Sequence, residues 1–371
     1  MKKNRDEYWD LVKGIGIASI VIGHSCSFAA PFVYTYHLVI FFFVGGYFYN
    51  TSKYSLHPFT FVFKTIKTSY VRYIFYSIIL ILLHNISVKN NMLLREEYIS
   101  RDFLIAIKKT LLFKCPELFA GALWFVIVYI VSLAIFAYIV FISEVISNKS
   151  IKNKSIQFKN RTADLMVTIA CIFIGAIGCY RNIHGLELIY NLHTSLLVVP
   201  IIAAAYFVKK YKIPLKELSK AFLAPIFAII LLILVYVKGL RIELSQEKII
   251  NSWMFYLVSV VGIIFCLCLA NLLCNFKILK YIFSFLGKYS FSIMALHFFV
   301  FKVIDCIYSY LIGETNVERI SQWVVSYSNQ LWPIYAILGT ALPAAFAFLL
   351  NTIANKLSSI SVHYKNLRFL S

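Results

Sequence analysis

The chain has 371 residues, of which 61% are hydrophobic, 17% aromatic and only 14% charged. Soluble domains contain about 45–50% apolar and about 25% charged residues, so this composition excludes a soluble globular protein and a disordered chain. The formal charge of +20 fits basic residues gathered in cytoplasmic loops of a membrane protein. We therefore predict one all-α membrane domain over residues 1–371, surrounded by the lipid bilayer, with no separate soluble domain.

Several kinds of site are not expected. The sequence contains no zinc-finger spacing and no basic DNA-binding helix, so no nucleic acid partner is predicted. Seven of the eight cysteines lie in apolar runs, where cysteine behaves as a small buried hydrophobic residue. We expect no metal and no permanently bound cofactor.

Ten stretches are long and apolar enough to be predicted as membrane-spanning helices, which need about 20 residues. They are 9–30, 33–50, 69–88, 119–142, 163–180, 187–208, 221–238, 252–274, 289–311 and 331–351. With both termini in the cytoplasm, most of the 36 Lys and Arg residues lie in cytoplasmic segments, as the positive-inside rule requires. In the outer loop 89–118, apolar residues recur every four positions at Phe103, Ile107 and Leu111, which predicts a helix on the membrane surface.

The first stretch carries three ionisable residues, Asp10, Lys13 and His24. Eleven helical residues turn through about 1100°, close to three full turns, and rise roughly 16 Å, so Lys13 and His24 share one side of the helix. Asp10, three residues before Lys13, lies on that side too. Such residues in a span are costly and indicate function. The alternatives are a Lys13 that reaches the headgroups and a His24 that only joins two helices.

Further polar residues lie at the ends of the next stretches. His37 is predicted near the outer end of the second, where it could share a cavity with His24. The basic residues Lys64, Lys67 and Arg72 are either ordinary cytoplasmic charge or a clamp for phosphate beside Lys13.

The fourth and ninth stretches add the remaining candidates. Trp124 either belongs to the interfacial aromatic belt or lines a site, and Glu117 before it is either a solvated loop acid or a ligand-binding group. In the ninth stretch, His297 either lines the cavity or bonds a neighbouring helix. Lys302 and Asp305 are three residues apart and can pair with each other.

Taken together and in chain order, these residues resemble the membrane-bound acyltransferase family 3, and its fucose-acetylase-like branch in particular. The opening follows the family pattern of an Asp, then a basic residue before Gly, then a His eleven residues after the basic one. Three later elements, at the second, fourth and ninth stretches, resemble family motifs in order. The matching segments are Asp10–His24, His37–Tyr47, Leu123–Val126 and Gly287–His297. Two departures are a missing Ser before Gly45–Gly46 and a missing Pro after Arg72.

The resemblance implies transfer of an acyl group from cytoplasmic acyl-CoA, acetyl-CoA in particular, to a hydroxyl of an extracytoplasmic sugar or cell-surface glycan. His24 would act as general base or as nucleophile, and Asp10 would position Lys13. The cations expected to bind the CoA phosphates are Lys13, Lys67 and Arg72, and the residues expected on the acceptor side are His37, Trp124, His297 and Glu117.

The resemblance also implies a multi-pass protein of the bacterial plasma (inner) membrane. Its partners would be the glycan acceptor and, as further possibilities, a second copy of the chain or glycan-assembly proteins. The alternative function, from another class, is an exporter or flippase of polysaccharide or lipid-linked sugar that transfers no acyl group. An enzyme needs His24 at the reaction centre, whereas a flippase needs a wide polar path.

Overall fold

The computed structural model describes residues 6–150, 155–186, 188–245, 252–321 and 325–368. In these ranges the chain forms helices joined by turns and contains no strand, so the all-α prediction is confirmed. The long helices are α1 (Glu7–His24), α5 (Pro58–Leu82), α7 (Ser100–Leu111), α8 (Trp124–Ser150), α9 (Ile156–Ile183), α11 (Val199–Lys210), α14 (Ser252–Cys274), α15 (Lys277–Lys288), α16 (Ser290–Leu311) and α18 (Ser328–Arg368). The short helices are α2 (Ala30–Val33), α3 (Val39–Tyr47), α4 (Thr51–Tyr54), α6 (His84–Lys89), η1 (Leu118–Leu123), η2 (Ile189–Asn191), α10 (Leu192–Leu197), α12 (Leu215–Leu218), η3 (Ala221–Leu223), α13 (Ala224–Leu232), η4 (Ile233–Val237) and α17 (Val317–Ile320).

Among the described residues, six helices are long and apolar enough to cross a membrane. They are Pro58–Leu82, Leu118–Lys149, Ile156–Ile183, Met254–Cys274, Ser290–Leu311 and Ser328–Leu357. A seventh candidate is the pair Ile189–Leu197 and Val199–Lys210, which bends by 45° within the predicted stretch 187–208; its first residue, 187, lies outside the described ranges. The chain is therefore a multi-pass membrane protein. The described residues give six or seven candidate spans by length and composition, so the predicted count of ten is not confirmed.

Helix α1 forms most of the predicted stretch 9–30 but is not among these candidates. It is an 18-residue helix enclosed by other helices, with Leu11, Val12 and Val21 fully buried. Its first two turns carry Glu7, Asp10 and Lys13, which is more charge than the candidate spans have in their apolar windows. A helix that other helices cover in this way can hold charged residues at membrane depth without exposing them to lipid.

Two other predicted spans are shorter than expected. The stretch 33–50 breaks into α2 and α3, and the nine residues of α3 extend only about 14 Å, well short of a hydrocarbon core of about 30 Å. The stretch 221–238 becomes the apolar helix Ala221–Val237, whose last turns are the π-helical segment η4. A helix wound this way rises less along its axis than an α-helix of the same length.

The helix predicted in the loop 89–118 is present as α7. Its N-terminus is capped by the Asp102 carboxylate, which accepts a hydrogen bond of 3.1 Å from the Ile99 amide. Helix α7 packs against α5 through buried Ala106 and Thr110, while Leu104 and Leu111 are exposed. The exposed apolar side is therefore rotated from the one that the Phe103–Leu111 spacing predicted, because α5 covers part of that side.

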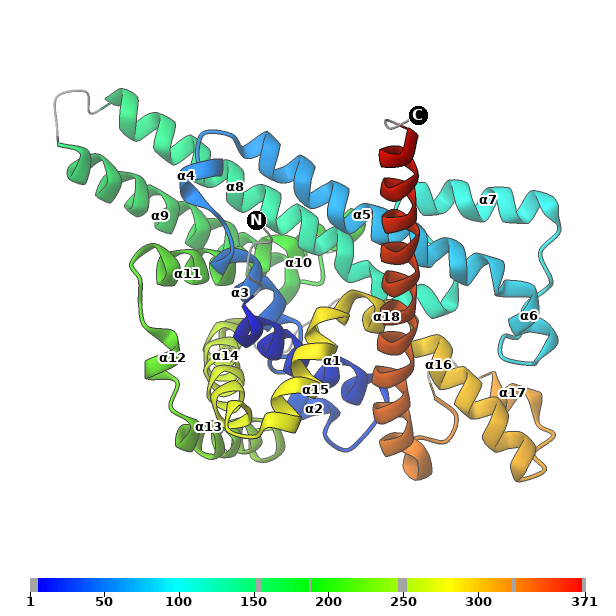
Figure 1. Ribbon diagram of the computed structural model, residues 1–371. Helices are drawn as coiled ribbons and strands as arrows, with labels where there is room; N and C mark the ends of the chain where they lie inside the picture. The colour runs from blue at the N-terminus through cyan, green and yellow to red at the C-terminus, as the bar shows by residue number, and fades with distance from the viewer. Residues whose placement is uncertain (1–5, 151–154, 187, 246–251, 322–324, 369–371) are drawn as a thin grey trace.

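The helices are arranged around α1. Figure 1 shows α5, α8 and α9 running alongside one another, with α13 and α14 on the opposite side of the molecule. Helix α1 lies between these groups and packs against α15, α18, α14 and α16. This places the polar residues of α1 at the centre of the molecule.

Helices α1 and α15 pack with their backbones in direct contact. A Cβ atom added at Gly14 would lie 1.8 Å from the Phe283 carbonyl oxygen, and one added at Gly287 would lie 1.7 Å from the Asp10 carbonyl oxygen. Both distances are to backbone atoms, which cannot rotate away. Only glycine at both positions allows the two backbones to touch, and this contact holds the segment that carries Asp10 and Lys13.

We expect Gly287→Ala to destabilise the protein by about 1–3 kcal/mol, the usual cost of overpacking, because α15 must move away from α1. The measurement is unfolding of the purified protein in detergent micelles. Ala345→Ser, which adds one heavy atom to an exposed position of α18, is the control and should unfold like the wild type. Equal stability of Gly287→Ala and the control would contradict the close contact.

Candidate active site

The polar residues of α1 lie on one side of the helix, as their spacing predicted. Lys13 Nζ lies 2.7 Å from the Asp10 carboxylate, and the Asp10 side chain is almost completely buried. Lys13 lines a cavity at one end of this side, and His24 lines a second space further along the helix. Helix α1 therefore connects a cationic region with an imidazole.

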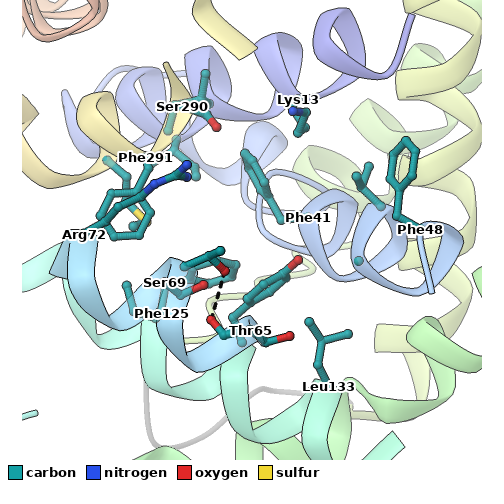
Figure 2. Close-up of a pocket in the computed structure, with 18 of the residues that line it drawn as sticks. Lys13, Phe41, Phe48, Thr65, Ser69, Arg72, Phe125, Leu133, Ser290 and Phe291 are labelled. Carbon is teal, nitrogen blue, oxygen red and sulfur yellow. Dashed lines mark hydrogen bonds between the residues drawn. The ribbon is translucent and has the colours of Figure 1, made fainter. Parts of the chain in front are cut away.

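The first cavity has a volume of about 380 Å³ and lies between α1, α3, α5, α8 and α16 (Figure 2). Its two cations are Lys13 and Arg72, and Arg72 also packs over the ring of Phe291 at 5.9 Å. Lys67 is exposed and does not line the cavity, so the structure separates it from the other two. The reason is helical: Lys67 lies five residues before Arg72, on a different side of α5.

A row of hydroxyl groups beside Arg72 was missed by the sequence analysis. Thr65, Thr68 and Ser69 line the same cavity. The spacing Phe61, Thr65, Thr68, Arg72 is that of one helical face. This spacing can be read from the sequence alone.

The first cavity and the space beside His24 are neighbours. Ile20, Phe125 and Met294 line both the first cavity and the second space, which measures only about 20 Å³. The second space is also lined by His24, His37 and Trp124. The three apolar side chains thus form the boundary between the cationic cavity and the two histidines.

His24 and His297 form a direct hydrogen bond of 2.8 Å between His24 Nδ1 and His297 Nε2. On its other side, His297 Nδ1 lies 3.0 Å from the Ile293 carbonyl oxygen, one turn earlier on α16. A carbonyl oxygen only accepts, so Nδ1 of His297 carries the proton and Nε2 of the neutral ring accepts. His24 Nδ1 must then donate. His24 Nε2 is therefore the nitrogen without a proton, and its lone pair is available for chemistry.

His37 lies in the turn between α2 and α3 and is buried beside the same space. Its Nδ1 lies 3.1 Å from the Val33 carbonyl oxygen, which again leaves Nε2 as the unprotonated nitrogen of the neutral ring. Tyr34 packs against both imidazoles, with ring centroids 4.9 Å from His37 and 6.4 Å from His24. The two histidines thus face one space, as the sequence predicted.

Glu117 is not the solvated loop acid that the sequence analysis considered. Its side chain is fully buried, and one carboxylate oxygen lies 3.0 Å from His84 Nδ1. It does not line the space beside His24, although Trp124 lines both that space and a cavity next to Glu117. His84 is 33 residues away in the chain, so only the folded structure reveals this pair.

Lys302 and Asp305 form the ion pair that their spacing predicted. Lys302 Nζ lies 2.9 Å from Asp305 Oδ2 and also donates to the Ile320 carbonyl oxygen at 3.0 Å. Asp305 in turn accepts hydrogen bonds from Ser326 and Tyr335. Both charges are fully buried and paired, so this group links α16 to the 317–326 segment and α18 and does not line either space.

The comparison with known families agrees with this arrangement. The family model of the type 3 acyltransferase domain matches residues 6–360. The chain belongs to this family. No curated protein and no solved structure matches it. The protein is thus a membrane acyltransferase, and the match covers every residue discussed above.

Within this acyltransferase, one acidic residue beside the histidines was missed by the sequence analysis. Glu243, in the segment after η4, lines the space next to His24 and His37, and it accepts a hydrogen bond of 2.8 Å from Ser245. Nothing in the local sequence marks Glu243, because it lies outside the helices and has no periodic pattern. Among the described residues, no three His, Cys, Asp or Glu side chains are grouped closely enough to hold a metal ion.

Proposed function

We propose that this membrane acyltransferase moves an acetyl group from cytoplasmic acetyl-CoA to a hydroxyl of an extracytoplasmic sugar or cell-surface glycan in the bacterial plasma membrane. The observation that carries the proposal is the cationic cavity that meets the His24 space at Ile20, Phe125 and Met294. The cytoplasmic position of both termini follows from the distribution of Lys and Arg. The proposed protein partners are a second copy of the chain or glycan-assembly proteins.

Lys13 and Arg72 would bind the phosphates of CoA, because guanidinium and ammonium groups make charge-assisted hydrogen bonds to phosphate oxygens. Asp10 would hold Lys13 in place through their 2.7 Å ion pair. The pantetheine arm would then follow α1 along the apolar side chains of Ile17 and Ile20, which line the cavity. Lys67, outside the cavity, has no part in this arrangement.

The unprotonated Nε2 of His24 can serve in two ways. As general base it takes the proton of the acceptor hydroxyl, whose oxygen attacks the thioester carbonyl; the C–S bond breaks, and the proton returns to the thiolate of CoA. As nucleophile it attacks the carbonyl itself, the C–S bond breaks and CoA leaves as the thiolate, and an acyl-imidazole forms while the Nδ1 proton passes to His297. The acceptor hydroxyl then attacks the acyl carbon and the C–N bond breaks; the hydroxyl proton goes to the thiolate, and the Nδ1 proton returns from His297. Labelled acetyl-CoA in single-turnover experiments distinguishes the two routes, because only the second leaves a labelled protein.

The acceptor hydroxyl would approach His24 from the side of His37 and Trp124. His37 Nε2 can accept a hydrogen bond from a sugar hydroxyl, because the proton of the neutral ring is on Nδ1, which donates to the Val33 carbonyl oxygen. The Trp124 ring offers a flat apolar surface of the kind on which sugar rings pack. His297 supports the reaction through His24 and not by touching the acceptor.

Arg72→Gln tests the donor site. We expect the Kd for CoA to rise about 10- to 100-fold, because a hydrogen bond to a charged group contributes about 1.5–3 kcal/mol. The measurement is titration calorimetry with CoA on the purified protein. Lys67→Gln, on the same helix but outside the cavity, is the matched control and should bind CoA like the wild type. Equal affinity of the two variants would contradict a CoA site at Arg72.

A further inference from the structure

A third cavity, separate from the two described above, is lined by Trp124 and Glu117. It has a volume of about 150 Å³, which is room for roughly five water molecules at about 30 Å³ each. Its walls come from α5, from the segment between α7 and η1, from η1 itself and from the start of α8. The lining residues are Tyr73, Phe113, Cys115, Glu117, Ala120, Gly121, Leu123, Trp124 and Ile127.

Glu117 is held rigidly at the edge of this cavity. Its Oε2 lies 3.0 Å from His84 Nδ1, while His84 Nε2 lies 3.0 Å from the Glu96 carbonyl oxygen. The ring of Tyr98 stacks on His84, with centroids 3.5 Å apart. Burial and, to a smaller extent, the nearby Glu117 raise the pKa of Tyr98 to about 12. The Tyr98 hydroxyl beside the His84–Glu117 pair therefore keeps its proton. One oxygen of Glu117 is thus fixed by protein contacts.

The other oxygen, Glu117 Oε1, and the hydroxyl of Tyr73 are buried and make no hydrogen bond of standard geometry among the described residues. Their polar neighbours are the Tyr98 hydroxyl beside Glu117, and Ser77 and the Cys115 backbone beside Tyr73. Glu117 and Tyr73 both line the cavity. A buried polar atom left unpaired costs about 1–3 kcal/mol, and more for a charged group, so such atoms in native proteins indicate a missing partner. The cavity therefore presents a strong acceptor and a hydroxyl to whatever occupies it.

The chemistry of the cavity selects a neutral ligand that carries hydroxyl groups. Both ring nitrogens of His84 face acceptor oxygens, so His84 and Glu117 share a proton that offsets the carboxylate charge. The pair then has no net charge with which to attract either a cation or an anion. The rings of Tyr73, Phe113 and Trp124 supply apolar faces. Aromatic faces combined with a few placed polar groups are typical of small-molecule sites and fit the alternating C–H and O–H surface of a sugar.

We propose that this cavity binds one neutral sugar unit of the acceptor, with Glu117 Oε1 accepting a hydrogen bond from a sugar hydroxyl. Trp124 lines both this cavity and the His24 space, so a unit bound here directs the neighbouring part of the acceptor toward His24. The link to catalysis rests on the proposed function; the binding of a sugar by the cavity does not.

The test measures binding of methyl glycosides to the purified full-length protein. The probes are methyl glycosides of common hexoses and 6-deoxyhexoses, and binding is followed by saturation-transfer NMR in detergent. Glu117→Met, which removes both oxygens, should raise the Kd of the best-bound glycoside about 10- to 100-fold. Glu117→Gln can donate to His84 Nδ1 and keep an acceptor oxygen toward the cavity, so it should retain most of the binding. Tyr73→Phe should raise the Kd by a smaller factor than Glu117→Met. Tyr49→Phe is the matched control, because Tyr49 also buries an unpartnered hydroxyl but lies outside this cavity.

Unchanged glycoside affinity in Glu117→Met and Tyr73→Phe would overturn the proposal, and so would a wild type that binds none of the glycosides. CoA affinity, measured on the same samples, keeps the two proposals apart and reports folding. Loss of glycoside binding with wild-type CoA affinity supports the sugar site. A wild type that binds glycosides but not CoA would refute the donor proposal and leave the sugar site standing.

Discussion

Cells in which His24→Asn replaces the wild type will lose the acyl esters of their surface glycan, although the protein is made in normal amounts. Asparagine still donates a hydrogen bond to His297 Nε2, so the packing of α1 against α16 is kept. Asparagine has no basic nitrogen to replace the unprotonated Nε2 of His24. Removing a general base costs about 10²–10⁴-fold in rate, and we expect a loss of about a thousandfold. The measurement is alkali-released acetate from purified glycan.

The control for this substitution is His184→Asn. His184 is exposed at the end of α9 and makes only a local contact to the Tyr180 carbonyl oxygen, so its loss should leave the esters unchanged. Retained esters in His24→Asn cells would refute the assignment of His24. Glycan that keeps its esters but fails to reach the surface when the gene is deleted would instead support an exporter.

The hydrogen bond between His297 and His24 gives a second test of the role of His24. His297→Gln keeps an oxygen that can accept from His24 Nδ1, whereas His297→Phe cannot. We expect the phenylalanine variant to lose more kcat than the glutamine variant, with the KM for acetyl-CoA unchanged in both. Activity should also fall as the pH is lowered, because a proton on His24 occupies the Nε2 lone pair. Equal kcat in the two variants would contradict a positioning role for His297.

Lys302→Met is expected to destabilise the protein by about 3–5 kcal/mol, because it leaves the Asp305 charge buried without its cation. Lys302 and Asp305 are both fully buried, 2.9 Å apart. The double variant Lys302→Met with Asp305→Leu should recover much of the stability, since replacing both members of a buried pair with apolar residues is often neutral. Unfolding of the purified proteins in mixed micelles measures both effects.

A matched control is Lys89→Met, which makes the same change in an exposed pair. Lys89 and Glu97 lie 3.4 Å apart but remain 65% and 48% exposed, and exposed pairs contribute at most about 1 kcal/mol. If Lys302→Met were as stable as Lys89→Met, the buried pair would not hold α16 to the 317–326 segment and α18. Because neither residue lines the proposed site, the CoA affinity of the folded fraction should stay at the wild-type value.

Local properties of the chain could be predicted well. The composition determined the class, and helical periodicity placed Asp10, Lys13 and His24 on one side of α1. The three-residue spacing of Lys302 and Asp305 predicted their pairing. Each of these conclusions depends on residues within a few turns of one helix, where geometry is nearly independent of the rest of the fold.

The site itself could be predicted only in part. Lys13 and Arg72 line the first cavity, and His24, His37 and Trp124 line the space next to it. Lys67 lines neither, because positive charge near a membrane surface marks a side of the bilayer and not a binding site. Glu243, which also lines the His24 space, had no sequence signal at all.

What the sequence by itself determined is therefore the membrane class, the all-α architecture, the family resemblance and the order of polar residues along α1. Only the tertiary structure decided the rest: that α1 is enclosed by protein, that His297 bonds His24 and leaves Nε2 free, and that His84 buries Glu117 beside a polar cavity. The reason is physical. Periodicity and hydropathy report how a residue relates to its own helix, whereas burial, tautomer and ion pairing depend on which distant helices pack against it.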